Sequence, residues 1–339
     1  MREINPKKAP GYDLITGKVI QEMSIKSIKV ITQIYNTVLR LEYFPAQWKI
    51  AQIILLLKPG KNPNDVASYR PISLLPILSK IFEKLLLKRL KPTLEKKNLI
   101  PDHQFGFRNH HSTVEQVHRL VKKISNDLEC KRYCSAAFLD ISQAFDKVWH
   151  EGHCYKLKQD LSHPIYQVIK SYLTNRFYLV KHQIEYTELF PISSGVPQGS
   201  VLGSILYLLF TADLPTNQRT MTATFADDTV ILSSHSNPEI ASTKLQNSLN
   251  EIQMWLNQWN IKVNETKSTH ITFTMKHGNC PPVMLNNNKI PQLEDVKYLG
   301  MYLDRRLTWK KHIWTKRKQL GTKLRQLYWL IGRKSSIVV

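Results

Sequence analysis

Apolar residues recur at the three- and four-residue spacing of amphipathic helices in four stretches of the chain. These stretches are residues 22–42, 78–90, 237–259 and 309–331. The third opens with Asn237-Pro238-Glu239. Asn is a preferred N-cap residue, Pro suits the first helical position, and the negative charge of Glu is favourable at the positive N-terminal end of a helix. We therefore predict four long helices, of which the last is strongly basic.

Short β-branched and apolar runs between these helices predict strands. Residues 51–57 read as a buried strand that enters a basic turn, Lys58-Pro59-Gly60-Lys61. A second run, 135–139, ends at Asp140, and the runs 222–226 and 229–232 flank Asp227-Asp228 as in a hairpin. Because strands and helices are mixed without strict alternation, the pattern predicts an α+β fold.

The charge of the chain points to a polyanionic partner. Lys and Arg number 48 against 26 Asp and Glu, a formal net charge of +22, and 42% of residues are apolar, as in a folded protein. Phosphates neutralised by such cations release condensed counterions, so nucleic acid is the expected partner. The longest apolar run, 53–57, is too short to span a membrane, and no membrane partner is expected.

The cysteines do not indicate a disulfide scaffold or a clear zinc site. The N-terminus lacks the apolar core of a signal peptide, so reduced thiols are expected. A zinc site could be assembled on paper, but its pieces are separated by strand-like sequence, and incidental thiols are the favoured interpretation. The residues of that imagined site are Cys130, Cys134, His150, His153 and Cys154.

Asp140, Asp227 and Asp228 are the candidate chemistry. Adjacent carboxylates repel each other unless a cation lies beside them, and their oxygens suit Mg²⁺ with water and phosphates as the remaining ligands. A third carboxylate from another strand could complete a two-ion clamp for phosphoryl transfer. Taken alone, however, an Asp pair is typical of a solvated turn, and a strand-end Asp is typical of a cap.

The neighbouring sequence resembles the reverse transcriptases of non-LTR retrotransposons, most closely the jockey-type elements of insects. Motifs A, B and C of that family resemble Asp140-Ile141-Ser142-Gln143-Ala144-Phe145-Asp146, Ser194-Gly195-Val196-Pro197-Gln198-Gly199 and Phe225-Ala226-Asp227-Asp228. Further matches, in the family's order, are Lys58-Pro59-Gly60-Lys61, Tyr69-Arg70-Pro71-Ile72-Ser73, Gln104-Phe105-Gly106-Phe107-Arg108, Lys267 and Tyr298-Leu299-Gly300. Group II intron maturases and telomerase share this core, but Gln104-Phe105-Gly106-Phe107-Arg108 together with Phe225-Ala226-Asp227-Asp228 favours the retrotransposon branch.

The resemblance implies a right-hand polymerase fold with fingers, a palm whose antiparallel sheet packs on helices, and a partial thumb. Residues 1–128 would form the fingers and N-terminal motifs, and 129–276 the palm, with a fingers segment interleaved at about 150–190. Residues 277–339 would hold the primer grip and the start of the thumb. The basic helix at 309–331 would then follow the backbone of a nucleic-acid duplex, whereas an ordinary solvated helix is the alternative.

The resemblance also implies residue roles. Two Mg²⁺ ions, with Mn²⁺ as a possible substitute, would be held by Asp140, the Ile141 carbonyl, Asp227 and Asp228. Lys267 would protonate the leaving pyrophosphate. The substrate contacts would be Lys58 and Arg70 on the triphosphate, Phe145 against a ribose 2′-OH, and Gln198 and Gly199 on nucleotide and template. Without the resemblance, the cations are ordinary surface charges, Phe145 a core aromatic and Gln198-Gly199 part of a turn.

The expected function is RNA-directed DNA synthesis, with an RNA template, a DNA primer and dNTPs as partners. The resemblance places the protein in nucleus and cytoplasm as a ribonucleoprotein and leaves its oligomeric state open. No endonuclease sequence precedes residue 1 and the thumb stops at Val339, so a truncated copy is expected. A nucleic-acid-binding remnant without catalytic activity is the alternative function.

Overall fold

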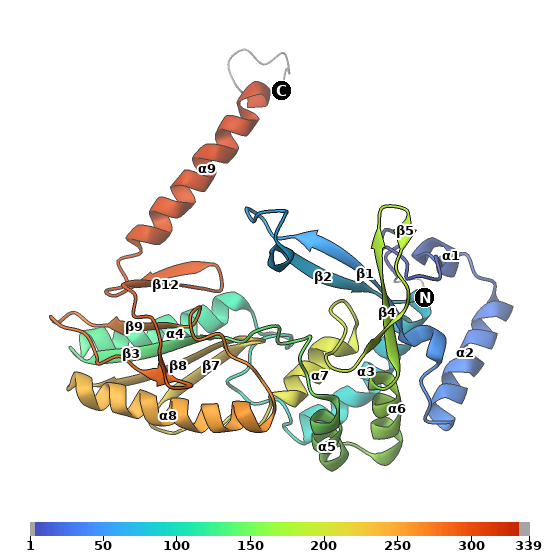
Figure 1. The fold of residues 1–339 in the computed structure, drawn as a ribbon, viewed down its shortest axis with the longest axis horizontal. Coiled ribbons are helices and arrows are strands. Elements are labelled where there is room, and N and C mark those ends of the chain that lie inside the picture. Colours follow the sequence, from blue (N-terminus) through green and yellow to red (C-terminus); the bar gives the residue numbers. More distant parts are fainter. Residues whose placement is uncertain (1–3, 332–339) are drawn as a thin grey trace. The chain divides into compact units, whose positions relative to one another are not determined.

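The computed structural model describes residues 4–331, which form two units. The first unit combines the chain up to Asp102 with Ser142–Leu214 and Leu256–Lys262. The second combines His103–Ile141, Pro215–Trp255 and the chain from Val263 onward. Each unit is therefore assembled from segments far apart in sequence (Figure 1).

The first unit holds a mixed sheet and most of the N-terminal helices. Its sheet has the order β2-β1-β4-β5, with β6 also paired to β4, and only the β1–β4 pair is parallel. The helical elements are α1 (Gly17–Gln21), α2 (Ile25–Arg40), η1 (Ala46–Lys49), η2 (Val66–Ser68), α3 (Ile77–Lys96), α5 (His150–Asp160), α6 (His163–Leu173) and α7 (Leu202–Phe210). The strands are β1 (Ile50–Leu57), β2 (Tyr69–Leu74), β4 (Arg176–His182), β5 (Glu185–Tyr186) and β6 (Phe190–Ile192).

The helix predicted over residues 22–42 is α2, shortened at both ends. Ser24 accepts a hydrogen bond from the Ser27 amide at 3.2 Å and so caps it. Its buried face carries Ile31, Tyr35 and Val38. The Tyr35 ring packs on Phe82 of α3, with ring centroids 5.5 Å apart.

Two expectations for the first unit were wrong. The strand predicted at 51–57 is present as β1, but Leu55, Leu56 and Leu57 are exposed. The reason is that β1 pairs with β4 only over Ile50–Ile53, so its second half lies in a two-stranded ribbon with β2. The helix predicted over residues 78–90 is present within α3, but its apolar residue Leu85 is exposed, because the buried face of this helix consists of Phe82, Leu86, Leu90 and Leu94.

The second unit is built on a four-stranded sheet of order β7-β8-β3-β9, antiparallel throughout. Its strands are β3 (Tyr133–Asp140), β7 (Met221–Phe225), β8 (Asp228–His235), β9 (Thr269–Phe273), β10 (Met284–Leu285), β11 (Asn288–Lys289), β12 (Asp295–Tyr298) and β13 (Met301–Asp304). Its helices are α4 (Thr113–Glu129), α8 (Pro238–Gln258, whose last three residues belong to the first unit) and α9 (Lys310–Ile331).

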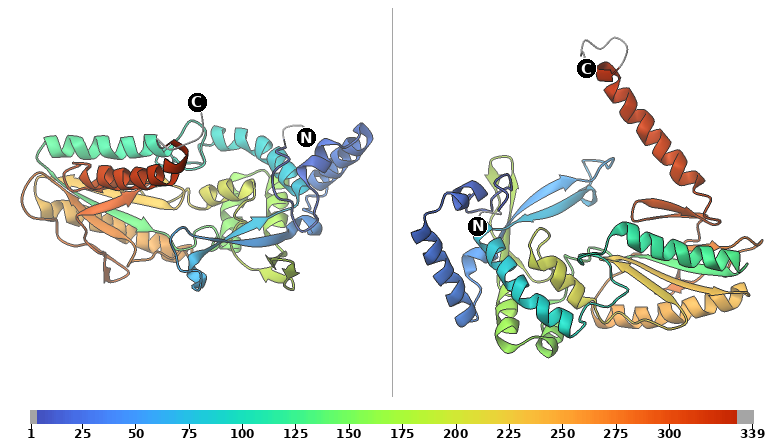
Figure 2. Two further views of the ribbon diagram at one scale, coloured as in Figure 1. Left: turned by 90° about the horizontal axis from the view of Figure 1, so that it is seen from above. Right: turned by 180° about the vertical axis from the view of Figure 1, so that it is seen from behind.

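Helices α4 and α8 cover opposite faces of this sheet (Figures 1 and 2). A capping box begins α4, since Ser112 and Glu115 each accept a hydrogen bond from the other's amide. Asn237 caps α8 as predicted, accepting from the Glu239 amide at 2.7 Å. Because both faces are covered, β3 and β9 are buried along nearly their whole length instead of alternating. The predicted antiparallel sheet packed on helices is thus confirmed.

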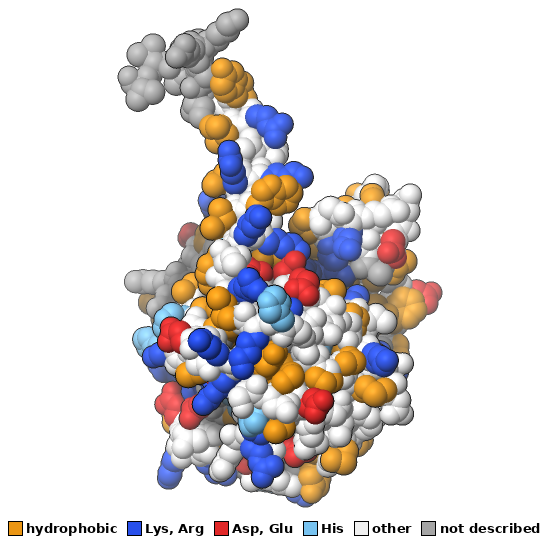
Figure 3. All heavy atoms as spheres, turned by 90° about the vertical axis from the view of Figure 1, so that its left-hand side faces the viewer, with side chains coloured by type: hydrophobic (Ala, Val, Ile, Leu, Met, Phe, Trp, Pro, Cys, Tyr) orange, Lys and Arg blue, Asp and Glu red, His pale blue; other side chains and the backbone are white. Residues whose placement is uncertain are grey.

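The last helix, α9, exposes both its charged and its apolar side chains. Ile313, Leu320, Leu324 and Leu327 lie at helical spacing, yet each is exposed. Figure 3 shows these apolar side chains among Lys and Arg along the helix. The predicted amphipathic helix is present, but its apolar stripe is exposed in place of being buried. None of the helices within residues 4–331 is long and apolar enough to cross a membrane.

Candidate active site

Asp227 and Asp228 lie at the hairpin that joins β7 to β8, as predicted. Phe225 pairs with Asp228, so Ala226 and Asp227 form the turn between them. Ala226 has a φ of 56°, in the left-handed region that few residues with a side chain adopt. The turn thus places two adjacent carboxylates at one end of the sheet.

Asp140 joins them from the neighbouring strand. The ladder between β3 and β8 ends with Asp140 opposite Asp228, which brings two strand ends to the same edge of the sheet. The Asp140 amide donates to the Ser268 hydroxyl at 3.1 Å, and its carbonyl accepts from the Asn264 amide at 2.8 Å. The backbone of Asp140 is thereby held on both sides, and Ile141 continues into a bridge with Val263.

A small cavity of about 100 Å³ connects these carboxylates with Lys267 and Tyr298. Asp140, Asp228 and Lys267 all line it, so the proposed general acid and two of the proposed ligands share one pocket. Lys267 is exposed, and its amide donates to the Asn264 side chain at 3.1 Å. Residues predicted from three separate motifs thus meet in the second unit.

The carboxylates influence each other's ionisation. The pKa of Asp228 is raised from 3.8 to about 6, first by burial and then by the negative charges of Asp227 and Asp140. A proton on Asp228 relieves this repulsion, and a bound cation would relieve it equally well. Above about pH 6, where Asp228 is mostly ionised, the site therefore favours a bound cation.

The donor set fits a hard divalent cation. Within residues 4–331, no group of three or more His, Cys, Asp or Glu side chains forms a ready metal cage. Mg²⁺ does not require one, because it usually binds one or two carboxylates and completes its octahedron with water and substrate phosphates. Three carboxylates at one sheet edge match that chemistry. Of the residues of the imagined zinc site, Cys130 and Cys134 belong to the second unit, and His150, His153 and Cys154 belong to the first.

Tyr298 was predicted as part of the primer grip, but its place beside the carboxylates was not foreseen. It ends β12, and Leu299 and Gly300 form the turn to β13 with positive φ values of 44° and 86°. The Tyr298 ring packs edge-on against Phe138 at 5.5 Å, and its buried hydroxyl has no hydrogen-bond partner within residues 4–331. Burial and the nearby Asp228 charge raise the pKa of Tyr298, so the phenol stays neutral. The ring reaches the cavity because the β12–β13 hairpin packs against the four-stranded sheet, on which it contacts Phe138.

The first unit contains the predicted nucleotide-contact loop. Gln198 donates from its amide nitrogen to both carboxylate oxygens of Asp146, at 2.9 and 3.0 Å. Its carbonyl accepts from the Ser73 amide of β2 at 2.8 Å. Gly199 has a φ of 110°, and a Cβ there would lie 2.8 Å from the Ser73 carbonyl oxygen, so only glycine fits. Asp146 is a residue whose part in orienting Gln198 the sequence did not reveal.

Phe145, Lys58 and Arg70 also lie in the first unit. The Phe145 ring stacks on Tyr207 of α7, with centroids 4.6 Å apart and ring planes 24° from parallel. Phe145 belongs to a turn after β3. Lys58 and Arg70 belong to the β1–β2 hairpin: the Lys58 amide donates to the Ser68 carbonyl at 2.8 Å, and Arg70 pairs with Leu56. The structure thus places three of the predicted substrate contacts around Asp146 and two on this hairpin.

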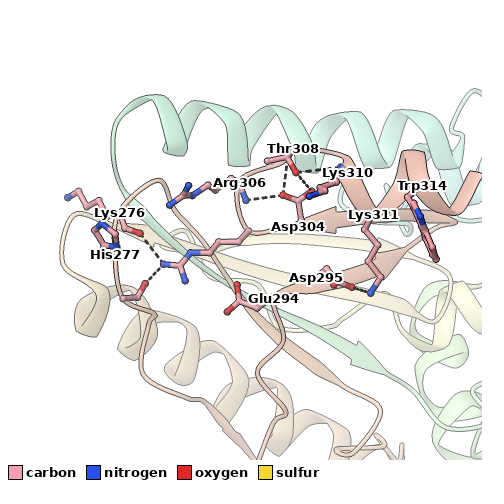
Figure 4. A pocket seen from close by; sticks show the side chains of 12 residues that line it. Lys276, His277, Glu294, Asp295, Asp304, Arg306, Thr308, Lys310, Lys311 and Trp314 are labelled. Atoms are coloured by element: carbon pink, nitrogen blue, oxygen red, sulfur yellow. Dashed lines mark hydrogen bonds and ion pairs between the residues drawn. The ribbon is translucent and has the colours of Figure 1, made fainter. Parts of the chain in front are cut away.

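A second cavity, of about 680 Å³, lies in the second unit at the start of α9 (Figure 4). Asp304 accepts hydrogen bonds from the amides of Thr308 and Trp309, the two residues before this helix, each at 2.9 Å. Lys311 forms an ion pair with Asp295. Trp314 lies beside these groups, and 63% of its surface is exposed. Its indole ring is therefore available for stacking against another aromatic ring.

Comparison with known proteins defines the class. Residues 57–303 match the family model of reverse transcriptase (RNA-dependent DNA polymerase), so the chain belongs to the reverse transcriptase family. Solved structures agree on the fold: the chain matches an apo telomerase from Candida tropicalis with a TM-score of 0.53 at 14% identity. That match covers 84% of this chain and 59% of the telomerase chain.

Within the family, the chain is similar to enzymes of non-LTR retrotransposons, as the motifs indicated. It is 42% identical over 339 residues to the RNA-directed DNA polymerase from mobile element jockey of Drosophila melanogaster, covering 98% of this chain and 37% of that protein. The corresponding Drosophila funebris protein is 41% identical, with 99% and 37% covered. The chain thus spans little more than a third of these relatives. Divalent metals are general in the family, in keeping with the donor set described above.

Proposed function

We propose that this chain catalyses RNA-directed DNA synthesis, extending a DNA primer with dNTPs along an RNA template. The observation that carries the proposal is the pairing of Asp140 with Asp228 at the sheet edge, next to Asp227 in the hairpin turn. Nucleotidyl transfer needs concentrated negative charge of this kind to hold cations against the triphosphate. Family membership supplies the reaction type.

In this proposal Asp140, Asp227 and Asp228 hold two Mg²⁺ ions, with the Ile141 carbonyl as a further ligand and Mn²⁺ as a substitute. Bound metal supplies the positive charge that activates the primer 3′-hydroxyl and neutralises the leaving pyrophosphate. Lys267, which lines the same cavity, donates a proton to that leaving group. The protein's contribution is positioning and charge stabilisation.

The first unit supplies the nucleotide contacts in the same proposal. Lys58 binds the triphosphate as a point charge, and Arg70 binds it with its forked guanidinium. Gln198, oriented by Asp146, contacts nucleotide and template, and the bare backbone of Gly199 permits close approach. Phe145 blocks a ribose 2′-OH, which selects dNTPs.

The test is a primer-extension assay with a primed RNA template, dNTPs and Mg²⁺ or Mn²⁺. The Asp227→Ala variant should lose extension, and Asp160→Ala, an aspartate at the end of α5 in the first unit, should retain it. If the wild-type chain extends no primer with either metal, the proposed function is wrong for this chain. If Asp227→Ala extends primers normally, the assignment of the metal site is wrong.

A second candidate is nucleic-acid binding without catalysis, favoured by α9. This helix carries seven Lys and Arg, no Asp or Glu, and the exposed aromatic residues Trp314, Tyr328 and Trp329. Cations combined with exposed rings suit single-stranded nucleic acid. This candidate predicts binding that weakens steeply with salt and survives Asp227→Ala, in a chain that extends no primer. Binding insensitive to salt would contradict it.

A further inference from the structure

The segment His103–Arg108 lies along the outer edge of β7, the strand that leads into the catalytic hairpin. The Thr224 amide donates to the His103 carbonyl at 3.0 Å, and the Phe105 amide donates to the Thr224 carbonyl at 2.9 Å. These two bonds form an isolated parallel bridge between Gln104 and Thr224. The segment therefore acts as a short additional strand that ends beside the turn.

The Gln104 side chain binds the backbone of that turn. Gln104 is 4% exposed, and its amide oxygen accepts from the Ala226 amide at 2.9 Å and from the Gly106 amide at 2.7 Å. Its amide nitrogen donates to the Ala226 carbonyl at 3.4 Å. One buried side chain thus satisfies both the N–H and the C=O of Ala226.

Gly106 makes this contact sterically possible. A Cβ at residue 106 would lie 2.3 Å from the Ala226 nitrogen and 3.0 Å from its Cα. Both atoms belong to backbone and cannot move aside cheaply. The segment therefore requires glycine two residues after Gln104 so that it can lie directly on the turn.

Ala226 needs such support. Its φ of 56° is unfavourable for a residue with a Cβ, and strained residues of this kind persist only where surrounding contacts over-determine them. The next two residues are Asp227 and Asp228, whose negative charges repel each other. Without the hydrogen bonds from Gln104, both effects would favour a different turn.

We propose that Gln104 is a positioning residue, which holds Ala226 in the left-handed conformation and thereby sets the direction of the Asp227 and Asp228 carboxylates. The structural part stands on the hydrogen bonds described above, while the catalytic consequence rests on the proposed function. The hydrogen bonds of the Gln104 side chain go to the backbone of Ala226 and Gly106, so its effect on the reaction passes through the hairpin.

The first measurement is hydrogen–deuterium exchange of the Ala226 amide in the metal-free protein. Gln104→Leu removes the acceptor at similar volume and should speed exchange at Ala226 by about tenfold or more. Gln104→Glu keeps two acceptor oxygens and should preserve most of the protection. The matched control is Gln116→Leu: Gln116 is also buried, and its side-chain amide donates to the His103 carbonyl of this segment and to the Thr224 carbonyl of β7. In Gln116→Leu, the exchange rate of the Ala226 amide should stay within about threefold of the wild-type rate.

The second measurement separates positioning from general destabilisation. In primer extension, Gln104→Leu should lower kcat by about tenfold while the KM values for dNTP and primer–template stay within about twofold. Gln116→Leu should change none of these by more than about threefold. Thermal unfolding of each variant shows whether it is folded, and Gln104→Glu tests the hydrogen bond if Gln104→Leu does not fold.

Two outcomes would overturn the proposal. The first is an amide exchange rate at Ala226 in Gln104→Leu that equals the wild-type rate. The second is that Gln104→Leu and Gln116→Leu lose protection at Ala226 and kcat to the same extent, which would show that Gln104 has a purely structural role. Because exchange requires neither metal nor substrate, it tests the hydrogen bonds even if the wild-type chain extends no primer. In that case the proposed function fails, and the exchange result still decides whether Gln104 holds the turn.

Discussion

Replacing Asp227 by Asn should lower the pKa of Asp228 without returning it to the ordinary value. The pKa of Asp228 is raised from 3.8 to about 6 by three causes, of which burial is the largest, the Asp227 charge the second and the Asp140 charge the third. Asn has nearly the shape of Asp but no charge, so the substitution removes only the second cause. We expect the order wild type, Asp140→Asn, Asp227→Asn, from highest pKa to lowest, with all three above 3.8.

The assay is a carbon-13 NMR titration of the aspartate carboxyls in metal-free protein, with the Asp228 signal assigned by an Asp228→Asn variant. Adding Mg²⁺ to the wild type should lower the pKa of Asp228, because the cation favours the charged form. Two results would refute the reasoning. If Asp140→Asn lowers the pKa of Asp228 more than Asp227→Asn does, Asp140 and not Asp227 has the stronger effect. If either variant returns the pKa of Asp228 to 3.8, burial is not the leading cause of the shift.

The same shift predicts how stability depends on pH. The folded chain keeps a proton on Asp228 that the unfolded chain releases between about pH 4 and pH 6. The contribution of Asp228 to the free energy of unfolding therefore falls as pH rises through this window. Urea denaturation should show a smaller fall in Asp227→Asn than in the wild type, and an equal fall would contradict the coupling.

Three further predictions test other parts of the structure. Asp146→Ala removes both acceptors of the Gln198 amide and should raise the KM for dNTP by about tenfold in steady-state extension; an unchanged KM would show that Asp146 does not orient Gln198. Phe145→Ala should raise incorporation of ribonucleotides relative to deoxyribonucleotides by about tenfold or more, measured as the ratio of kcat/KM values. No change in that ratio would exclude the ring as the 2′-OH block. Asn237→Ala should lower the free energy of unfolding by about 1 kcal/mol in urea titrations, and Asn237→Gly by only a few tenths. Equal losses in these two variants would argue against a capping role.

Local patterns in the sequence predicted local structure well. Asn237-Pro238-Glu239 begins α8, and the hairpin around Asp227 forms where its flanking strands indicate. Such features depend on residues within one helical turn or one hairpin, so nearby sequence contains the information. Burial was predicted less well: Leu55 and Leu85 are apolar but exposed, because burial depends on which distant strand or helix lies opposite.

The sequence by itself determined the family, the α+β class and the three carboxylates, because each depends on motif order or on short-range pattern. Only the tertiary structure decided that Asp140 faces Asp228 across a strand pair, that Tyr298 shares their cavity, and that Gln104 binds Ala226. These contacts join residues separated by 70 or more positions, and by 122 in the last case. No pattern along the chain can specify such pairings, because they follow from strand register and from the space left by a neighbouring glycine.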